Sequence, residues 1–351
     1  MNRRTGDHLS FLRTDIISLL DIDFKDDHIA PSYLTLLEQR AGNPDVDHLF
    51  RESFEWVYYG SALPGCRRFN YPPPGDIPHA RCSSLLINPA NGAAVYLIWQ
   101  TIRGDGDPLE WKRQAWNLFE QCDDPLHGLG LEIKEIERQY PFVAIRVDTE
   151  DVAGYCSEHA EELGRIFTGN FERDEREYLL EIMRLNLSRR DYERLFILWT
   201  DVLGVYSRNV SEEEQEKTML RGVQVFENCI LVRRLLRNLS EQADRLSSRL
   251  TVPRPWAVNR ISQSFLQIER QMIVAPPVQS VESERLLRGA YKNFGIDSLV
   301  EGTRNSCNFM ERRLQWSKTQ FLVAVGVIAY LLDKLKVFEN IGRILIKAHT
   351  S

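Results

Sequence analysis

The amino-acid sequence predicts an α+β protein, in which an N-terminal α/β domain with an antiparallel sheet precedes long helices that form a stalk or bundle. Two runs of β-branched and aromatic residues flank Asn91-Gly92, which is the strongest short-range signal for a β-hairpin. Over much of residues 212–351, apolar residues recur at alternating steps of three and four, the spacing of a helix seam. The two patterns together predict strands first and long helices afterwards.

The charge distribution supports this division of the chain. Residues 1–211 hold 23 basic and 35 acidic side chains, whereas residues 212–351 hold 21 and 15, so the net charges are −12 and +6. A split of this kind indicates separate domains, and it lets the basic half face an anionic surface such as phospholipid or nucleic acid. We divide the chain into a helical segment with a Pro-rich connector (1–78), an α/β domain (79–210) and a long-helix region (211–351).

The N-terminal region is predicted to hold short helices over 9–20, 32–41 and 46–59. The run from Pro72 to Gly75 follows, and three consecutive prolines cannot continue a helix, so the chain should run extended into the first strand.

The α/β domain is predicted to begin with a hairpin of strands over 82–88 and 93–102, with Asn91 and Gly92 at positive φ. A helix over 107–121 follows, then a second strand pair, a helix and a final hairpin. We place these last elements at 131–137 and 141–147, at 148–167, and at 194–200 with 202–206. Repetition of strand, strand and helix favours an antiparallel α+β layer over a βαβ nucleotide fold.

Ser211, followed by three glutamates, predicts the start of a long helix that runs to about Leu250, because its hydroxyl can accept from free amides of an acidic first turn. Prolines 253 and 255 break the chain, and Gly295 is placed as a left-handed helix end before a last helix from Asp297 to Phe338. These helices carry the residues that we predict to form an oligomer seam: Val225, Val232, Leu236, Leu239, Leu246, Leu250, Met310, Leu314, Phe321, Ile328 and Leu331.

The strongest apolar run of the chain is the twelve-residue stretch 321–332. A membrane-spanning helix needs about twenty residues, and a run of about 10–14 is more typical of a core or interfacial helix. Trp316 and Tyr330 could lie near lipid head groups, while lysines beside the run could reach outward. Three alternatives stay open: a membrane-embedded helix within 316–338, a helix buried in an oligomer, and a helix lying in the membrane plane.

The sequence contains no P-loop, no G-x-G-x-x-G after a strand, no G-x-S-x-G and no H-E-x-x-H. Weak metal-ligand candidates are Asp45, Asp47 and His48, although Asn43-Pro44-Asp45 is also a natural helix-start turn. Cys156 and His159 have helical spacing, but no third group or oxyanion donor is evident, which favours structural packing. No cofactor is predicted. Residues that could contact an anion or phosphate are Arg233, Arg234, Arg237, Arg312 and Arg313.

Six cysteines are scattered without a C-x-x-C pair, which is typical of reduced, buried thiols in a cytoplasmic protein. The first apolar stretch is broken by Arg13 and Asp15, so it lacks a signal-peptide core. We therefore expect a cytoplasmic protein, which the C-terminal helix could anchor to the inner face of a membrane.

The order of the parts resembles the CorA-type magnesium channel family, in which an acidic α/β domain precedes a stalk helix, intervening helices and a very long helix that turns apolar. The resemblance covers roughly residues 80–338 and rests on segment order and on the helices at 221–250 and 300–338. The chain lacks that family's Gly-Met-Asn signature and a second apolar segment, so the resemblance implies an architecture and assigns no residue a role in ion conduction.

These observations favour a non-catalytic homo-oligomer, with possible membrane contact, in which an α/β domain that senses a ligand or partner is joined to a helical stalk. One alternative is a soluble scaffold or effector subunit of a multi-protein or nucleic-acid complex, although the lack of interleaved aromatic residues disfavours nucleic acid. Another alternative is an enzyme with an unrecognised site in the N-terminal domain.

Overall fold

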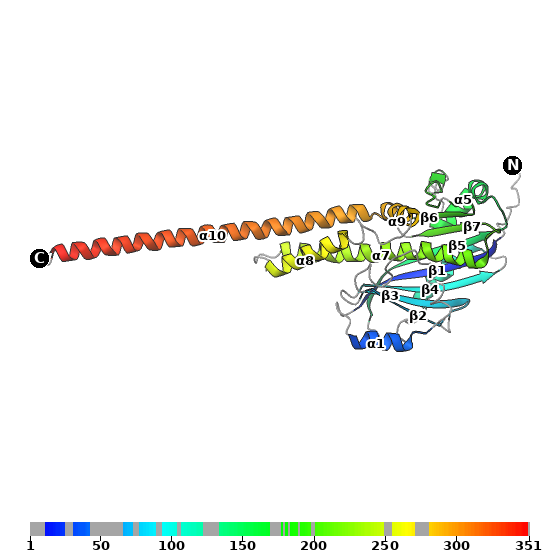
Figure 1. Cartoon of the computed structure of the whole chain (residues 1–351), viewed down its shortest axis with the longest axis horizontal. Helices are drawn as coiled ribbons and strands as arrows, with labels where there is room; N and C mark the ends of the chain where they lie inside the picture. The colour runs from blue at the N-terminus through cyan, green and yellow to red at the C-terminus, as the bar shows by residue number, and fades with distance from the viewer. Residues whose placement is uncertain are drawn as a thin grey trace. The chain divides into compact units, whose positions relative to one another are not determined.

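The computed structural model describes two compact units of the chain (Figure 1). The first comprises Met1–Leu235 and Ile268–Leu299, and the second comprises Leu236–Gln267 and Val300–Ser351. The boundary predicted at 210/211 falls inside the first unit. The described residues are 11–24, 31–42, 66–72, 77–88, 93–103, 107–121, 133–168, 177, 180–181, 183–188, 190–197, 201–248, 255–270 and 281–349.

The first unit is built on a mixed seven-stranded sheet of order β2-β3-β4-β1-β5-β7-β6. Its strands are β1 (Phe11–Phe24), β2 (Arg67–Tyr71), β3 (Ala80–Ile87), β4 (Ala93–Arg103), β5 (Ile133–Val147), β6 (Glu193–Ile197) and β7 (Val202–Tyr206). All pairs are antiparallel except β5 with β7. The α+β class is confirmed, but the sheet is mixed, whereas an antiparallel sheet was predicted.

Strand β1 replaces the helix predicted over 9–20, and that prediction is wrong. β1 lies between β4 and β5 at the centre of the sheet, so both of its edges are paired, and Ile16, Ile17, Leu19 and Leu20, which alternate between the two faces, are all buried. A strand buried on both faces reads as a continuous apolar run, which periodicity alone does not distinguish from a buried helix.

Two further predicted elements differ in their extent. The strand pair at 131–137 and 141–147 is the single strand β5, because Pro141 lies just before the point where β7 begins to pair, at Phe142. Pro141 lies opposite Ser18 of β1, so the pairing with β1 continues through it as one strand. The helix predicted over 148–167 is two helices, α4 (Val152–Glu158) and α5 (Ala160–Thr168), which are separated at His159.

The other hairpins agree with the sequence analysis. β3 pairs with β4 with Ile87 opposite Ala94, and β6 pairs with β7 around Asp201. The φ angles predicted for Asn91 and Gly92, and the helix predicted over 46–59, lie outside the described residues.

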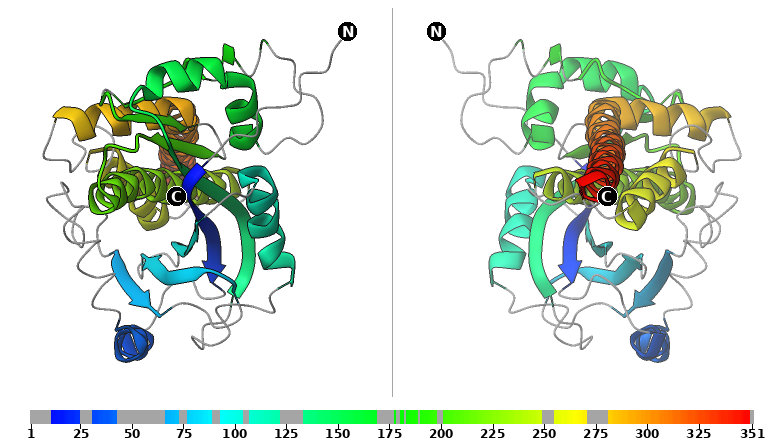
Figure 2. Two further views of the ribbon diagram at one scale, coloured as in Figure 1. Left: turned by 90° about the vertical axis from the view of Figure 1, so that its right-hand side faces the viewer. Right: turned by 90° about the vertical axis from the view of Figure 1, so that its left-hand side faces the viewer.

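Helices cover both faces of the sheet (Figure 2). On one face, α1 (Pro31–Arg40) packs on an apolar cluster of β1 to β4, while α4 and α5 pack on a second cluster of β5 to β7, beside α3 (Pro108–Gln121). The opposite face carries the first part of α7 (Glu212–Ser248). A Cβ atom added at Gly222 of α7 would lie 3.2 Å from the Phe142 ring, so glycine permits this close approach of the helix to the sheet. Helix α9 (Val281–Asn293) lies beside α7, where Tyr291 Oη donates to Asn228 Oδ1 at 2.6 Å.

The second unit is helical. It contains the end of α7, α8 (Pro255–Ile268) and most of α10 (Ile296–His349), a helix of 54 residues. Ser262 Oγ donates to Glu311 Oε1 at 2.6 Å, and Thr303 Oγ1 donates to the Leu236 carbonyl at 3.3 Å. The three helices contribute the following buried residues: Leu236, Leu239, Ala243, Val258, Ile261, Phe265, Val300, Cys307, Met310 and Leu314. Gly295, at φ 72°, separates α9 from α10 as predicted.

Candidate functional site

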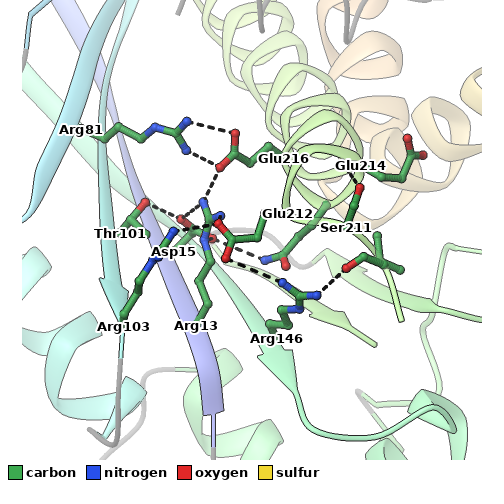
Figure 3. Close-up of polar contacts among 12 residues, drawn as sticks. Arg13, Asp15, Arg81, Thr101, Arg103, Arg146, Ser211, Glu212, Glu214 and Glu216 are labelled. Atoms are coloured by element: carbon green, nitrogen blue, oxygen red, sulfur yellow. Dashed lines mark hydrogen bonds and ion pairs between the residues drawn. The ribbon is translucent and has the colours of Figure 1, made fainter. Parts of the chain in front are cut away.

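The candidate site lies in the first unit, where the first two turns of α7 contact the sheet (Figure 3). Seven charged side chains interact there. We call them the arginine–carboxylate cluster: Arg13 and Asp15 of β1, Arg81 of β3, Arg103 of β4, Arg146 of β5, and Glu212 and Glu216 of α7.

Asp15 is the buried centre of the cluster, with a side chain that is 0% exposed. Its Oδ1 accepts from Arg13 Nη2 at 2.9 Å, from Trp99 Nε1 at 3.0 Å and from Thr101 Oγ1 at 2.6 Å. Its Oδ2 lies 2.8 Å from Arg13 Nε and accepts from Gln215 Nε2 at 3.4 Å. A buried carboxylate with this many donors is held in one orientation.

Glu216 forms the second layer and is also nearly buried. Its Oε1 accepts from Arg13 Nη2 at 2.8 Å and from Arg81 Nη1, while its Oε2 accepts from Arg81 Nη2 at 3.0 Å. The Arg81 guanidinium lies over the Trp99 ring, 4.5 Å from its centroid. This bidentate pair and the stacked ring fix the second turn of α7 to β3 and β4.

Glu212 forms the outer layer, and its side chain is 47% exposed. Its Oε2 accepts from Arg103 Nη2 at 2.7 Å and from Arg13 Nη1 at 3.3 Å, and its Oε1 lies 4.0 Å from Arg146 Nη1. Arg146 Nη2 in turn donates to the Arg208 carbonyl at 2.8 Å and to the Val210 carbonyl at 2.5 Å, just before α7 begins. One solvent-accessible carboxylate is therefore shared by three guanidinium groups.

Strand register places those three arginines side by side. Arg13 is directly opposite Arg103 on β4 and directly opposite Arg146 on β5. We call this row of three the arginine ladder. Like charges directly opposite each other in a sheet cost roughly 0.2–1 kcal/mol per pair, so the ladder needs counter-ions, which α7 supplies as glutamates.

The start of α7 is fixed locally, as the sequence predicts. Ser211 Oγ accepts from the Glu214 amide at 3.1 Å, which confirms the N-cap. Glu212, Glu213 and Glu214 make the first turn acidic and complement the positive end of the helix dipole.

The four guanidinium groups of the cluster keep their positive charge at physiological pH. Burial lowers the pKa of Arg13, but Asp15 and Glu216 outweigh this and raise it above its ordinary value. The cluster holds four arginines and three carboxylates, and a guanidinium does not give up its proton at physiological pH. Such a site can orient and bind an anion.

Two other buried ion pairs join α7 to the same sheet face. Arg68 of β2 donates to Glu227, and Arg234 Nη1 lies 3.7 Å from Asp21 Oδ2 of β1. On the opposite face, Lys112 of α3 is buried, and its Nζ donates to the carbonyls of Ile166 and Phe167 at 3.0 and 2.6 Å and to Asp201 Oδ1 at 2.6 Å. Burial lowers the pKa of Lys112, and Asp201 partly offsets the shift.

The five arginines predicted to contact an anion are divided between the two units of the chain. Arg233 and Arg234 belong to the first unit, whereas Arg237, Arg312 and Arg313 belong to the second. Arg234 pairs with Asp21, Arg233 lies over the Phe294 ring at 5.3 Å, and Arg237 Nε lies 3.4 Å from Glu241 Oε1.

The predicted seam residues fall into three groups. Buried side chains are those of Val225 and Val232 in the first unit and Leu236, Leu239, Met310 and Leu314 in the second. Leu246 is half-buried, and Leu250 lies outside the described residues. Exposed side chains are those of Phe321, Ile328 and Leu331.

The remaining candidates are placed as follows. Asp45, Asp47 and His48 lie outside the described residues, and within the described part no group of three or more His, Cys, Asp or Glu is arranged to hold a metal. Cys156 is buried, and burial raises its pKa to about 12, which opposes thiolate formation. His159 packs against the Tyr155 ring, with centroids 4.5 Å apart.

The arginine–carboxylate cluster was not predicted from the sequence, because Arg13 and Asp15 were expected to lie in a helix. The signal was present, since a charged pair two residues apart inside an apolar run places both side chains on one face of a strand.

Among the described helices, none combines the length and the apolar character needed to cross a membrane. Comparison of the chain with protein-family models, with curated protein sequences and with solved structures gives no significant match.

Proposed function

We propose that this protein is a non-catalytic, oligomeric subunit in which the α/β domain receives a ligand or partner and the C-terminal helices assemble with other copies and contact a membrane. This architecture resembles that of CorA-type channels in the order of its parts. The observation that carries the proposal is the exposure of α10 between Phe321 and Leu332.

In that segment the large apolar side chains are 45–69% exposed, and none of its twelve residues is polar apart from the Tyr330 hydroxyl. Single exposed apolar side chains are ordinary, but a continuous apolar surface marks a site that something else covers. The helix is apolar around its whole circumference, so a narrow seam that faces one partner helix does not cover it.

The symmetry of an oligomer indicates that lipid covers part of the apolar surface of α10. In a closed ring of identical chains every copy has the same surroundings, so each α10 keeps one outward face. In water that face would expose Leu322, Val325 or Leu332, whereas the apolar layer of a membrane covers it. Lys318, Lys334 and Lys336 flank the segment and are suited to anionic head groups. The twelve residues are about 18 Å long, so we propose contact with the apolar layer rather than a span.

The test is truncation after Gln315, followed by membrane fractionation and sedimentation of the purified protein. We expect the full chain to pellet with membranes and the truncated chain to remain in the supernatant with lower oligomeric mass. If both chains stay in the supernatant and only the mass changes, α10 is covered by protein alone, which favours the soluble scaffold. Unchanged fractionation and unchanged mass would overturn the proposal.

A further inference from the structure

The arginine ladder is an unusual feature for a strand face beneath a helix. Arg103, Arg13 and Arg146 stand directly opposite one another on three adjacent strands, and their guanidinium groups converge on a single side chain, Glu212. Apolar residues at these register positions would serve packing at a lower electrostatic cost. Features that cost stability in this way are concentrated at functional sites.

The carboxylates of the cluster are not equivalent. Asp15 and Glu216 are buried and are enclosed by donors, so they are fixed parts of the fold. Glu212 is the one carboxylate of this cluster that solvent reaches freely, and its strongest partner, Arg103, has a side chain that is 69% exposed. Glu212 therefore occupies a basic position that is open to an external anion.

The geometry of that position suits a phosphoryl group better than a carboxylate. A phosphoryl group presents three terminal oxygens and nearly two negative charges, and guanidinium groups bind it through paired hydrogen bonds. The start of α7 lies at the same place, where the first-turn amides and the dipole of a 37-residue helix favour negative charge. Arg13 adds a buried, permanent positive charge behind the other two arginines.

We propose that a phosphorylated small molecule binds at the arginine ladder, where its phosphoryl group takes the place of the Glu212 carboxylate and contacts Arg103, Arg13 and Arg146. This inference rests on the proposed function, because it names the ligand class of the sensing domain. When the ligand displaces Glu212, the ion pairs between α7 and the sheet arginines are lost, and the arginines pair with the ligand instead. Ligand binding therefore changes the contacts of the first turn of α7.

The test is calorimetric titration of the full-length protein, kept in mild detergent, with pyrophosphate as the probe. We expect Arg103→Gln to weaken binding by about tenfold or more, because one charge-assisted pair is lost. Glu212→Gln should tighten binding several-fold, because it removes the internal competitor. The matched control is Glu213→Gln, since Glu213 is on the same turn but pairs with Lys217 at 2.8 Å, and this change should leave the affinity within twofold.

A second titration uses phosphatidylcholine vesicles with and without phosphatidic acid, which separates a lipid phosphate from a soluble one. Pyrophosphate binding that depends on Arg103 supports a soluble ligand, and Arg103-dependent binding to phosphatidic acid alone supports a lipid head group. Absence of both, or equal effects of Glu212→Gln and Glu213→Gln, would overturn the inference. Membrane fractionation of the truncated chain does not involve the ladder, so the proposed function can fail or survive independently.

Discussion

Helices α7 and α10 carry the same three-and-four spacing of apolar residues, yet they meet opposite surroundings. In α7, Val225, Val232 and Leu236 are buried within their own units, whereas in α10 the side chains from Phe321 to Leu332 remain exposed. The spacing therefore predicts a helix reliably but does not say what covers it. The answer lies in the other side chains: α7 has charged residues that pair with the sheet, and α10 has a segment that is apolar on every side.

The largest effect should come from charging buried positions of the second unit. Leu236→Asp with Leu239→Asp places two carboxylates among apolar side chains, and we expect a loss of more than about 5 kcal/mol in the free energy of unfolding. Urea denaturation followed by circular dichroism measures this loss.

The matched variant on α10 is Ile328→Asp with Leu331→Asp. These side chains are already exposed, so the free energy of unfolding should change by less than about 1 kcal/mol, while membrane sedimentation of the full chain should fall sharply. Equal destabilisation by the two double variants would show that the contrast between α7 and α10 is not real.

A smaller but still large effect is expected at the buried lysine of α3. Lys112→Met leaves Asp201 and two carbonyl groups without their donor, which should cost about 3–5 kcal/mol at neutral pH. Lys217→Met removes a helical i,i+4 pair with the exposed Glu213 and should cost less than about 1 kcal/mol.

The pH dependence of the Lys112 effect gives a second measurement. Because the pKa of Lys112 is lowered in the folded chain, the unfolded chain binds more protons between that pKa and 10.5. Stability contributed by this group should therefore rise as pH rises through that window. We expect denaturant midpoints of the wild-type chain, compared with those of Lys112→Met, to show the rise, and parallel profiles would contradict it.

The smallest predicted effect is at the start of α7. Ser211→Ala removes the acceptor of the Glu214 amide and should cost about 1 kcal/mol. Ser211→Asp keeps an acceptor and should restore most of that loss. If both variants unfold like the wild-type chain, the cluster alone fixes the helix start and the cap is dispensable.

The sequence could predict those features that local chemistry determines. Ser211 as a cap, Gly295 as a left-handed helix end and the β3–β4 hairpin all depend on a few neighbouring residues, and the structure confirms each. Strand β1 could not be identified by period, because its side chains are buried on both faces of the sheet and its strand partners lie more than sixty residues away.

The candidate site was harder to predict than the fold. Arg13, Arg103 and Arg146 are far apart in the sequence, and strand register alone makes them neighbours. The arginines predicted to contact an anion were grouped by their closeness along the helices, and they belong to two different units. Proximity in sequence is a good guide within a helix, but within a sheet the pairing of distant strands decides which charges meet.

The central place of β1 has a consequence for how the chain is made. Its residues leave the ribosome before those of its neighbours β4 and β5, which begin only at Ala93 and Ile133. At about 5–20 residues per second, synthesis through β5 takes on the order of ten seconds after β1 has emerged. During that interval an apolar strand has no partner on either edge, and long-range pairings of this kind form slowly. We therefore expect the yield of native protein to depend on how well β1 is shielded until the strands on both sides of it exist.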